Sequence, residues 1–196
     1  MLKKDKSIPY SSFIGGYYID SDVCDMMIDY FNQNKERCTR GHTSINGVNQ
    51  VHEETKDSLD YYFHPHEVHT PIYEYKVELQ KCLDMYCQDY DTVQSVAAFN
   101  LNIPANIQYY PAGGGYKVWH CERSGLATSD RILVFLTYLN DVKDGGTEFY
   151  YQKLKTQAKK GLTIICPTDW THTHRSVVSK TEEKYIATGW YTHTGQ

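Results

Sequence analysis

The chain has 196 residues, of which 40% are hydrophobic, and its formal net charge at pH 7 is -4. A chain of this length can bury a complete core, and its scattered lysines and arginines form no basic stripe of the kind that binds nucleic acid. No apolar stretch approaches the roughly 20 residues of a membrane-spanning helix and the N-terminus has no apolar signal segment, so we expect a soluble, cytoplasmic protein without nucleic-acid or membrane partners.

Two helices are predicted in the first half of the chain. Ser21-Asp22 can cap a helix that runs to about residue 34, because apolar residues recur along it at helical spacing. Thr70-Pro71 begins a second helix of about 18 residues, since a capping hydroxyl precedes a proline at the first helical position. Residues 39–69 between them are predicted to be a long loop that includes a short strand. The second helix should bury one face, formed by Ile72, Tyr75, Leu79, Leu83, Tyr86 and Tyr90.

After about residue 93 the hydrophobic period changes to two, which is typical of β-strands. Turn sequences rich in Gly, Pro and Asp separate the alternating segments. Short strands at this spacing indicate a β-sandwich or barrel of the jelly-roll type. Helices followed by strands indicate an α+β layout with the helices packed on one sheet. The predicted strands are 107–110, 117–122, 131–140, 147–151, 162–166 and 184–192.

We therefore predict a single domain over residues 1–196, with a mainly helical and loop part at 1–92 and a jelly-roll core at 93–196. The chain also has six cysteines, none of which forms a C-x-x-C pair. This spacing argues against a closed structural zinc site, and a chain of this length needs no disulfide framework. We expect mostly buried thiols at Cys24, Cys38, Cys82, Cys87, Cys121 and Cys166.

Candidate metal ligands occur in the predicted strand region. His120 and Glu122 lie on one predicted strand, where side chains at i and i+2 share a face and can converge on one ion. Either His172 or His174, about 50 residues later, would add a second histidine. Two histidines and one carboxylate cover one face of an octahedral metal and leave three positions open, which suits non-haem Fe(II) oxygenases.

A second histidine cluster competes with this interpretation. His64, His66 and His69 lie in the loop before the second predicted helix, and we expect them on the surface near the mouth of an active site. An H-x-E pair on a strand is, in most proteins, an exposed polar pair. Spacing alone therefore does not choose between the two clusters.

The residues around His120 and His174 resemble the prolyl 4-hydroxylase-like branch of the 2-oxoglutarate- and Fe(II)-dependent oxygenases. The resemblance spans about residues 93–193 and consists of several motifs in the family's order. It implies a double-stranded β-helix with the metal ligands His120, Glu122 and His174. In that family a basic residue follows the distal histidine by ten positions, and Lys184 has this spacing from His174, which favours His174 over His172. The motifs are Tyr110-Pro111, His120-Cys121-Glu122, Tyr138-Leu139-Asn140, Gly145-Gly146, Cys166-Pro167, His174, Lys184 and Trp190.

The resemblance also implies where the co-substrate 2-oxoglutarate binds. Lys184 would bind its distal carboxylate, and the hydroxyl of Tyr138 is assigned to the same carboxylate. Tyr110 resembles the family tyrosine near the metal-binding end of the co-substrate. Thr188, four residues after Lys184 on one predicted strand, faces the same side and is a further candidate. The rival interpretation is core packing for both tyrosines and an ordinary strand-edge lysine for Lys184.

The implied activity is that of a dioxygenase that uses Fe(II), 2-oxoglutarate and O2. It would hydroxylate a C–H bond and release succinate and CO2, and the family's frequent need for ascorbate implies an ascorbate dependence. On resemblance alone, the substrate is a prolyl or another amino-acid residue of a peptide or protein, and a small free amino acid is the alternative. Trp190 is expected to pack beneath the site, and Arg131 and Arg175 to form salt bridges or bind a substrate carboxylate.

Glu122 is the one departure from the family pattern, which usually has Asp at this position. Glutamate keeps the charge and the oxygen donor but adds a methylene group. We expect it to bind the metal. The alternative is a non-catalytic jelly-roll binding module with a degenerate metal site. A zinc hydrolase would be a third class, but it would leave Lys184 and Tyr138 without a purpose.

Overall fold

The computed structural model describes residues 2–45 and 48–195. Its helices are α1 (Ser21–Gln33) and α2 (Ile72–Asp89). Its strands are β1 (Lys3–Lys4), β2 (Gly15–Tyr18), β3 (Thr39–Arg40), β4 (His42–Ile45), β5 (Val48–Val51), β6 (Lys56–Asp57), β7 (Leu59–Phe63), β8 (Phe99–Asn100), β9 (Ala105–Tyr110), β10 (Gly115–Tyr116), β11 (Arg131–Tyr138), β12 (Thr147–Phe149), β13 (Leu154–Lys155), β14 (Leu162–Pro167), β15 (His174–Ser176) and β16 (Lys184–His193).

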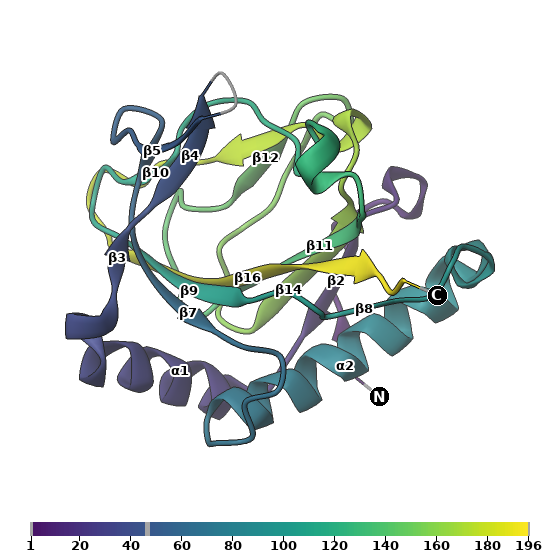
Figure 1. The fold of residues 1–196 in the computed structure, drawn as a ribbon, viewed down its shortest axis with the longest axis horizontal. Coiled ribbons are helices and arrows are strands. Elements are labelled where there is room, and N and C mark those ends of the chain that lie inside the picture. Colours follow the sequence, from purple (N-terminus) through teal and green to yellow (C-terminus); the bar gives the residue numbers. More distant parts are fainter. Residues whose placement is uncertain (1, 46–47, 196) are drawn as a thin grey trace.

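The two helices cover one face of a large antiparallel sheet, and the smaller sheets lie over the other face (Figure 1). The large sheet has the order β1-β2-β14-β11-β16-β9-β7-β3, and β8 pairs with β16. The other layer contains the three-stranded sheet β13-β12-β15 and the pairs β10-β6 and β4-β5. The predicted α+β arrangement, with the helices packed on one sheet, is therefore confirmed.

Both predicted helices are present, with small differences at their first turns. Asp20, rather than Ser21-Asp22, caps α1, and its side chain accepts a hydrogen bond from the backbone N–H of Asp22 at 2.9 Å. Pro71 directly precedes the first residue of α2 instead of being that residue. Neither helix in the described part of the chain combines the length and the apolar composition needed to cross a membrane.

The large sheet is buried on both faces because side chains alternate along its central strands. On β11, Leu133 and Phe135 pack with the helices, whereas Val134 and Leu136 face the other layer. This alternation is the pattern that predicted strands at 131–140, 162–166 and 184–192, and β11, β14 and β16 confirm them. All six cysteines are free thiols.

The expectation that residues 39–69 form a long loop was wrong. Five strands, β3 to β7, lie in this segment, and β7 pairs with β9 inside the large sheet. Asp60, the second residue of β7, is fully buried, and aspartate is depleted in strands. It is accommodated because Nζ of Lys56 lies 2.6 Å from its carboxylate and Ser58 donates a second hydrogen bond to it.

The predicted strand at 117–122 was also wrong. Strand β10 ends at Tyr116, and the chain then pairs with β15 at one isolated bridge between His120 and His174. Two backbone hydrogen bonds, of 3.0 and 2.9 Å, join these two histidines. The bridge brings together two segments that are more than 50 residues apart in the sequence.

Candidate metal centre and its cavity

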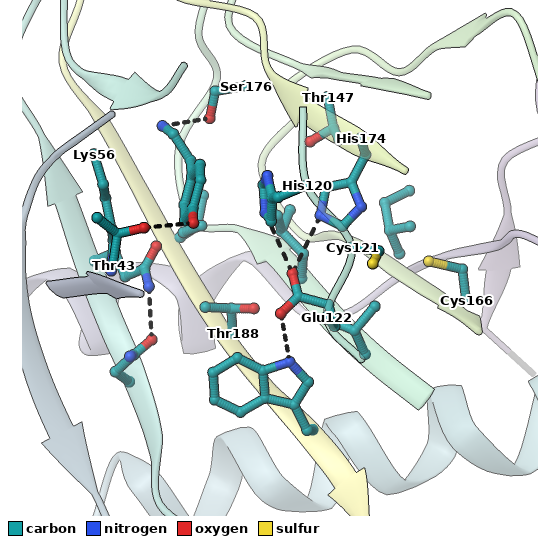
Figure 2. A pocket seen from close by; sticks show the side chains of 18 of the residues that line it. Thr43, Lys56, His120, Cys121, Glu122, Thr147, Cys166, His174, Ser176 and Thr188 are labelled. Atoms are coloured by element: carbon teal, nitrogen blue, oxygen red, sulfur yellow. Dashed lines mark hydrogen bonds and ion pairs between the residues drawn. The ribbon is translucent and has the colours of Figure 1, made fainter. Parts of the chain in front are cut away.

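Three side chains that can bind a metal meet at this bridge. The Nε2 atoms of His120 and His174 lie 3.4 and 3.3 Å from Oε1 of Glu122 (Figure 2). One ligand atom from each residue lies within 4.8 Å of the others. The structure thus brings together the three residues that the sequence motifs indicated, although His120 and Glu122 are not on a regular strand.

Hydrogen bonds on the far side of each ring set the orientation of the histidines. Nδ1 of His120 lies 3.0 Å from the carbonyl oxygen of Val118, and Nδ1 of His174 lies 2.9 Å from that of His172. A carbonyl oxygen only accepts, so Nδ1 carries a proton in each ring, and Nε2 is the nitrogen that faces Glu122 and would bind a metal. Metal-binding histidines usually have such a partner on the other nitrogen.

Electrostatics favour an ionised carboxylate at this position. Burial by itself raises the pKa of Glu122, but hydrogen bonds and charge interactions with His120 and His174 outweigh burial and hold that pKa well below its usual range. Burial likewise lowers the pKa of His174, and the hydrogen bond with Glu122 reverses this, so that its pKa is raised. An anion between two imidazoles is the charge arrangement that a divalent cation would complete.

The donor set fits a non-haem iron site. Ligand atoms that are neighbours on an octahedron lie roughly 3 Å apart when the metal–ligand bonds are about 2.1 Å long. The two observed separations, 3.4 and 3.3 Å, are close to this spacing. Two imidazole nitrogens and one carboxylate oxygen occupy a single face, which is the set typical of Fe(II) oxygenases.

The other histidines lie outside this group. Nε2 of His172 is 3.0 Å from the carbonyl oxygen of Ser12, so this buried ring points away from the cluster. His64, His66 and His69 are not buried, in agreement with the surface position expected for them. None of these three lines the cavity at the metal centre, and their position near its mouth stays a prediction.

A cavity of about 420 Å³ adjoins the three candidate ligands. Both layers of the fold contribute to its lining, and so do the exposed side chains of His42, Tyr62 and Ser124. The candidate co-substrate residues Tyr110 and Thr188 line it as well. The hydroxyl of Tyr110 donates to the side chain of Gln108, and that of Thr188 donates to the carbonyl of Phe135.

The cavity runs along strand β16. Ile186, Thr188 and Trp190 line it, at every second position of the strand. Trp190 donates a hydrogen bond to Glu122 at the metal end. Lys184 is the next residue on the same face, at the opposite end of this row.

Lys184 is buried at this far end, behind the residues that line the cavity, and only 4% of its surface is exposed. Its Nζ atom donates to the carbonyls of Gly145 at 2.9 Å and Val177 at 3.4 Å. Within residues 2–45 and 48–195, no carboxylate pairs with it, and burial lowers its pKa to about 8. An ammonium group has three N–H donors, so at least one remains for an anion.

Tyr138 is fully buried and does not line the cavity. Its hydroxyl lies 2.7 Å from that of Thr147 and 2.8 Å from that of Thr156. Thr147 does line the cavity. Tyr138 can therefore reach a ligand only through Thr147 or after a rearrangement of these hydrogen bonds.

One wall of the cavity is polar, and of its residues on β9 only Tyr110 was predicted from the sequence. Asn106, Gln108 and Tyr110 alternate along β9, and the carboxamide of Gln108 donates to that of Asn106 at 3.1 Å. Three polar side chains at i, i+2 and i+4 of an otherwise apolar strand were the available signal. Lys56, whose ammonium group is paired with Asp60, also lines the cavity, but it lies in the segment that was predicted to be a loop.

Tyr116 is a second residue that was missed. Its ring stacks on that of His120, with centroids 3.7 Å apart and planes 19° apart. Its hydroxyl lies 2.8 Å from that of Thr43 on β4. The stack restricts the plane of the metal-facing imidazole, and no spacing rule in the sequence indicated it.

The expected salt bridges of the two arginines are present. Nη1 of Arg131 lies 3.7 Å from Glu122, and Nη2 of Arg175 lies 3.0 Å from Glu148. Arg131 also lines the cavity, whereas Arg175 does not.

Comparison with known families agrees with this site. The family model described as the 2OG-Fe(II) oxygenase superfamily matches residues 105–192. Over this stretch the chain is similar to that superfamily. The match includes the three candidate ligands and Lys184, and it confirms the superfamily that the motifs indicated. None of the curated proteins matches the chain significantly.

Solved prolyl hydroxylases have a similar fold. A Pseudomonas putida prolyl-4-hydroxylase superposes with a TM-score of 0.69 at 14% identity, over 93% of this chain and 94% of that one. The viral collagen prolyl hydroxylase of Paramecium bursaria Chlorella virus-1, solved with 2-oxoglutarate, gives 0.66 at 18% identity, over 93% and 97%. A Trichoplax adhaerens prolyl hydroxylase, solved with a peptide fragment of a hypoxia inducible factor, gives 0.71 at 15% identity, over 93% and 84%.

Proposed function

We propose that the protein is an Fe(II)- and 2-oxoglutarate-dependent dioxygenase in which His120, Glu122 and His174 hold the iron. The observation that carries this proposal is one row of side chains on β16, with the three-ligand cluster at one end and the buried cation of Lys184 at the other. A dianionic co-substrate that chelates a metal through one end needs a cation at its other end. We infer that the two layers around this row form the double-stranded β-helix that the motifs imply.

Lys184 would bind the distal carboxylate of 2-oxoglutarate. A buried ammonium group without an anion is unfavourable, and an incoming carboxylate would relieve that cost. Thr147, with Tyr138 behind it, would add hydroxyl groups near the same end of the co-substrate. Tyr110 and Thr188 line the space between this end and the metal.

When bound, iron with 2-oxoglutarate and O2 supplies the oxidising chemistry, and the protein contributes binding and orientation. His120 and His174 would hold the metal through Nε2, with the proton of each ring kept on Nδ1 by a backbone carbonyl. Val134, Leu136 and Ile164 line the cavity with apolar surface, which excludes water from part of the site.

The substrate is proposed to be a prolyl or other amino-acid residue of a peptide or protein. The fold is similar to those of prolyl hydroxylases, one of which was solved with a peptide. The cavity is bordered by exposed side chains of β4 and β7 and of the segment 123–130, as access by a larger substrate requires. Release of succinate and CO2 would accompany hydroxylation, with ascorbate sustaining activity.

An anaerobic titration with Fe(II) and then 2-oxoglutarate tests the site. We expect a visible charge-transfer band that appears only with both ligands, and its absence would contradict the proposal. Succinate release would then be measured with prolyl peptides, other peptides and free amino acids, with and without ascorbate. A charge-transfer band without succinate release from any substrate would instead favour a binding module. Zinc-stimulated hydrolysis that does not respond to 2-oxoglutarate would indicate a hydrolase.

A further inference from the structure

We propose that Trp190, supported by Arg131, is a positioning residue that keeps one oxygen of the Glu122 carboxylate directed at the two histidines. The inference rests on the proposed function, because it concerns the metal that these ligands would hold. It goes beyond that function by assigning a role to two residues that are not ligands, and by giving a physical reason for glutamate where the family usually has aspartate.

The two oxygens of Glu122 have separate partners. Oε1 faces the Nε2 atoms of the two histidines. Oε2 accepts a hydrogen bond from Nε1 of Trp190 at 2.8 Å and lies 3.7 Å from Nη1 of Arg131. Because Oε2 is already engaged, the carboxylate presents a single oxygen to the position between the imidazoles.

The length of the glutamate side chain allows its carboxylate to contact the two histidines and Trp190 at the same time. The carboxylate of an aspartate at position 122 would lie closer to the backbone by one C–C bond, about 1.5 Å. From the same backbone position, an aspartate carboxylate would lose its contact either with the two histidines or with the indole N–H. Glutamate also has one more rotatable bond than aspartate, and ordering it on metal binding costs more side-chain entropy. The indole N–H orders that bond before any metal arrives.

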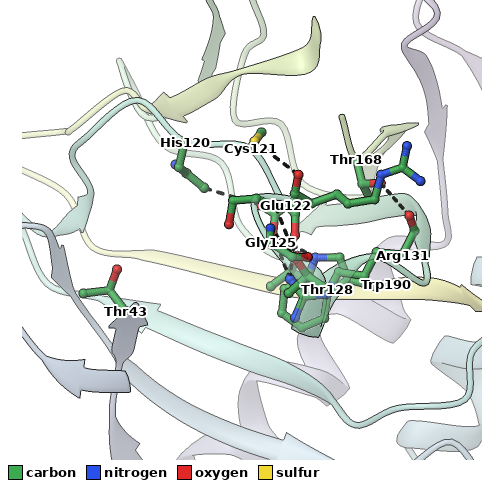
Figure 3. Close-up of polar contacts among 12 residues, drawn as sticks. Thr43, His120, Cys121, Glu122, Gly125, Thr128, Arg131, Thr168 and Trp190 are labelled. Atoms are coloured by element: carbon green, nitrogen blue, oxygen red, sulfur yellow. Dashed lines mark hydrogen bonds and ion pairs between the residues drawn. The ribbon is translucent and has the colours of Figure 1, made fainter. Parts of the chain in front are cut away.

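Arg131 holds the indole and the backbone of Glu122 together. Its guanidinium carbon lies 3.7 Å from the centre of the Trp190 ring, and Figure 3 shows the two side chains together beside Glu122. Nη1 of Arg131 also donates to the backbone carbonyl of Glu122 at 2.9 Å. One cation thus fixes both the ring that holds Oε2 and the main chain from which the ligand extends.

A bulge in β11 directs Arg131 into the cavity. Along β11, Arg131 lies opposite Thr192 of β16, and Leu133, two residues later, lies opposite Tyr191. The register between the two strands therefore shifts between Arg131 and Leu133. Val134 and Leu136 line the cavity, so regular alternation would turn Ile132 inward. Instead Ile132 packs with the core under the helices, and Arg131 lines the cavity. Bulges beside active sites commonly redirect a side chain in this way.

The test measures Co(II) affinity by calorimetry, which does not depend on turnover. Trp190→Phe keeps an aromatic ring under Arg131 but removes the N–H. Loss of an outer hydrogen-bond partner typically weakens metal binding about 10–100-fold, and we expect about 10-fold here. In a Glu122→Asp background the same substitution should change affinity less than about twofold, because the shorter carboxylate does not depend on the indole.

Trp119→Phe is the matched control. Trp119 directly precedes His120 but stacks on Arg175, 4.3 Å away, and does not line the cavity. Its substitution should leave Co(II) affinity unchanged. An equal loss from Trp190→Phe in the wild-type and Glu122→Asp backgrounds, or no loss in either, would overturn the proposal.

Failure of this inference can be distinguished from failure of the proposed function. A wild-type protein that binds neither Co(II) nor Fe(II) contradicts the metal site itself. If Trp190→Phe does not fold, Arg131→Met tests the same oxygen from its other partner while keeping an unbranched stem over the indole. It should weaken Co(II) binding in the wild-type background more than in the Glu122→Asp background. Equal effects would contradict the proposal that Arg131 and Trp190 hold Oε2 of Glu122.

Discussion

The charged groups at the two ends of the cavity differ in the partners that the protein provides for them. At the metal end, the carboxylate of Glu122 is surrounded by His120, His174, Trp190 and Arg131, so every charge has a partner in the protein. At the far end, the ammonium group of Lys184 contacts two backbone carbonyls and lies 5.3 Å from the centre of the Tyr110 ring, but no carboxylate among the residues that the structure describes pairs with it. The pKa shifts reflect this difference, since that of Glu122 is lowered by its partners whereas that of Lys184 is lowered by burial.

The difference indicates how each end obtains its stability. The metal end is already ordered by internal hydrogen bonds, so a metal would find its ligands in place. The far end retains an unfavourable buried charge that only an anion from outside would balance. Substitutions at the two ends should therefore have opposite effects on the protein without ligands.

The largest effect is expected from His174→Ala. It removes a proposed ligand, so Fe(II) affinity should fall by more than the roughly 100-fold upper range for loss of an outer partner, and succinate release should be lost. His172→Gln is the control, because it keeps a donor for the carbonyl of Ser12. Calorimetry and a succinate assay measure both variants. Loss of metal binding in the His172 variant alone would reverse the assignment.

Lys184→Met should weaken 2-oxoglutarate binding about 10–100-fold, because a hydrogen bond to a charged group contributes about 1.5–3 kcal/mol. Fe(II) affinity should not change, since Lys184 is at the other end of the row. Titration of the charge-transfer band gives both constants. If Fe(II) and 2-oxoglutarate affinities fell together, the two ends would not be independent.

The same lysine predicts how affinity depends on pH. Binding of a carboxylate needs the protonated ammonium group, and its pKa without ligand is lowered by burial to about 8. Affinity for 2-oxoglutarate should be constant below pH 8 and fall about tenfold per unit above it. Lys184→Arg, which stays charged, should remove this decline. A decline at the same pH in the arginine variant would assign it to another group.

The stability of the folded protein should depend on pH in the opposite direction from its affinity for 2-oxoglutarate. Because the folded-state pKa of Lys184 is below its unfolded value near 10.5, the cost of the buried charge is fully present below pH 8. It disappears as the pH rises from about 8 to 10.5. The free energy of unfolding of Lys184→Met relative to wild type should therefore decrease by about 3 kcal/mol over this range, at about 1.4 kcal/mol per unit of pKa shift. Urea unfolding at several pH values measures it, and a flat difference would show that Lys184 is not buried as a cation.

The sequence predicted the parts of the fold and site that depend on local spacing. The helices α1 and α2 and the strands β11, β14 and β16 follow from hydrophobic period. His120 and Glu122 converge as predicted, although only His120 pairs with another strand, at its bridge to His174.

The missed parts depend on contacts between distant segments. Strand β7 contains a buried aspartate, and its burial depends on the ion pair with the lysine of β6 and on the hydrogen bond from Ser58. The carbonyls around Lys184 come from residues 145 and 177, which no pattern near Lys184 indicates. The hydrogen bond of Trp190 to Glu122 likewise joins residues 68 positions apart.

The smallest predicted effect is at Tyr138, where family resemblance and the observed hydrogen bonds differ most. Its hydroxyl is paired with Thr147 and Thr156 and does not line the cavity. If it acts through Thr147, Tyr138→Phe removes one neutral hydrogen bond, and about 1 kcal/mol corresponds to a loss of about fivefold in 2-oxoglutarate affinity. Thr156→Val, which disturbs the same network away from the cavity, should lower stability by a similar amount and leave that affinity nearly unchanged. Equal effects of the two variants on affinity would mean that Tyr138 only packs the core, and a loss as large as that of Lys184→Met would mean that its hydroxyl turns to the co-substrate directly.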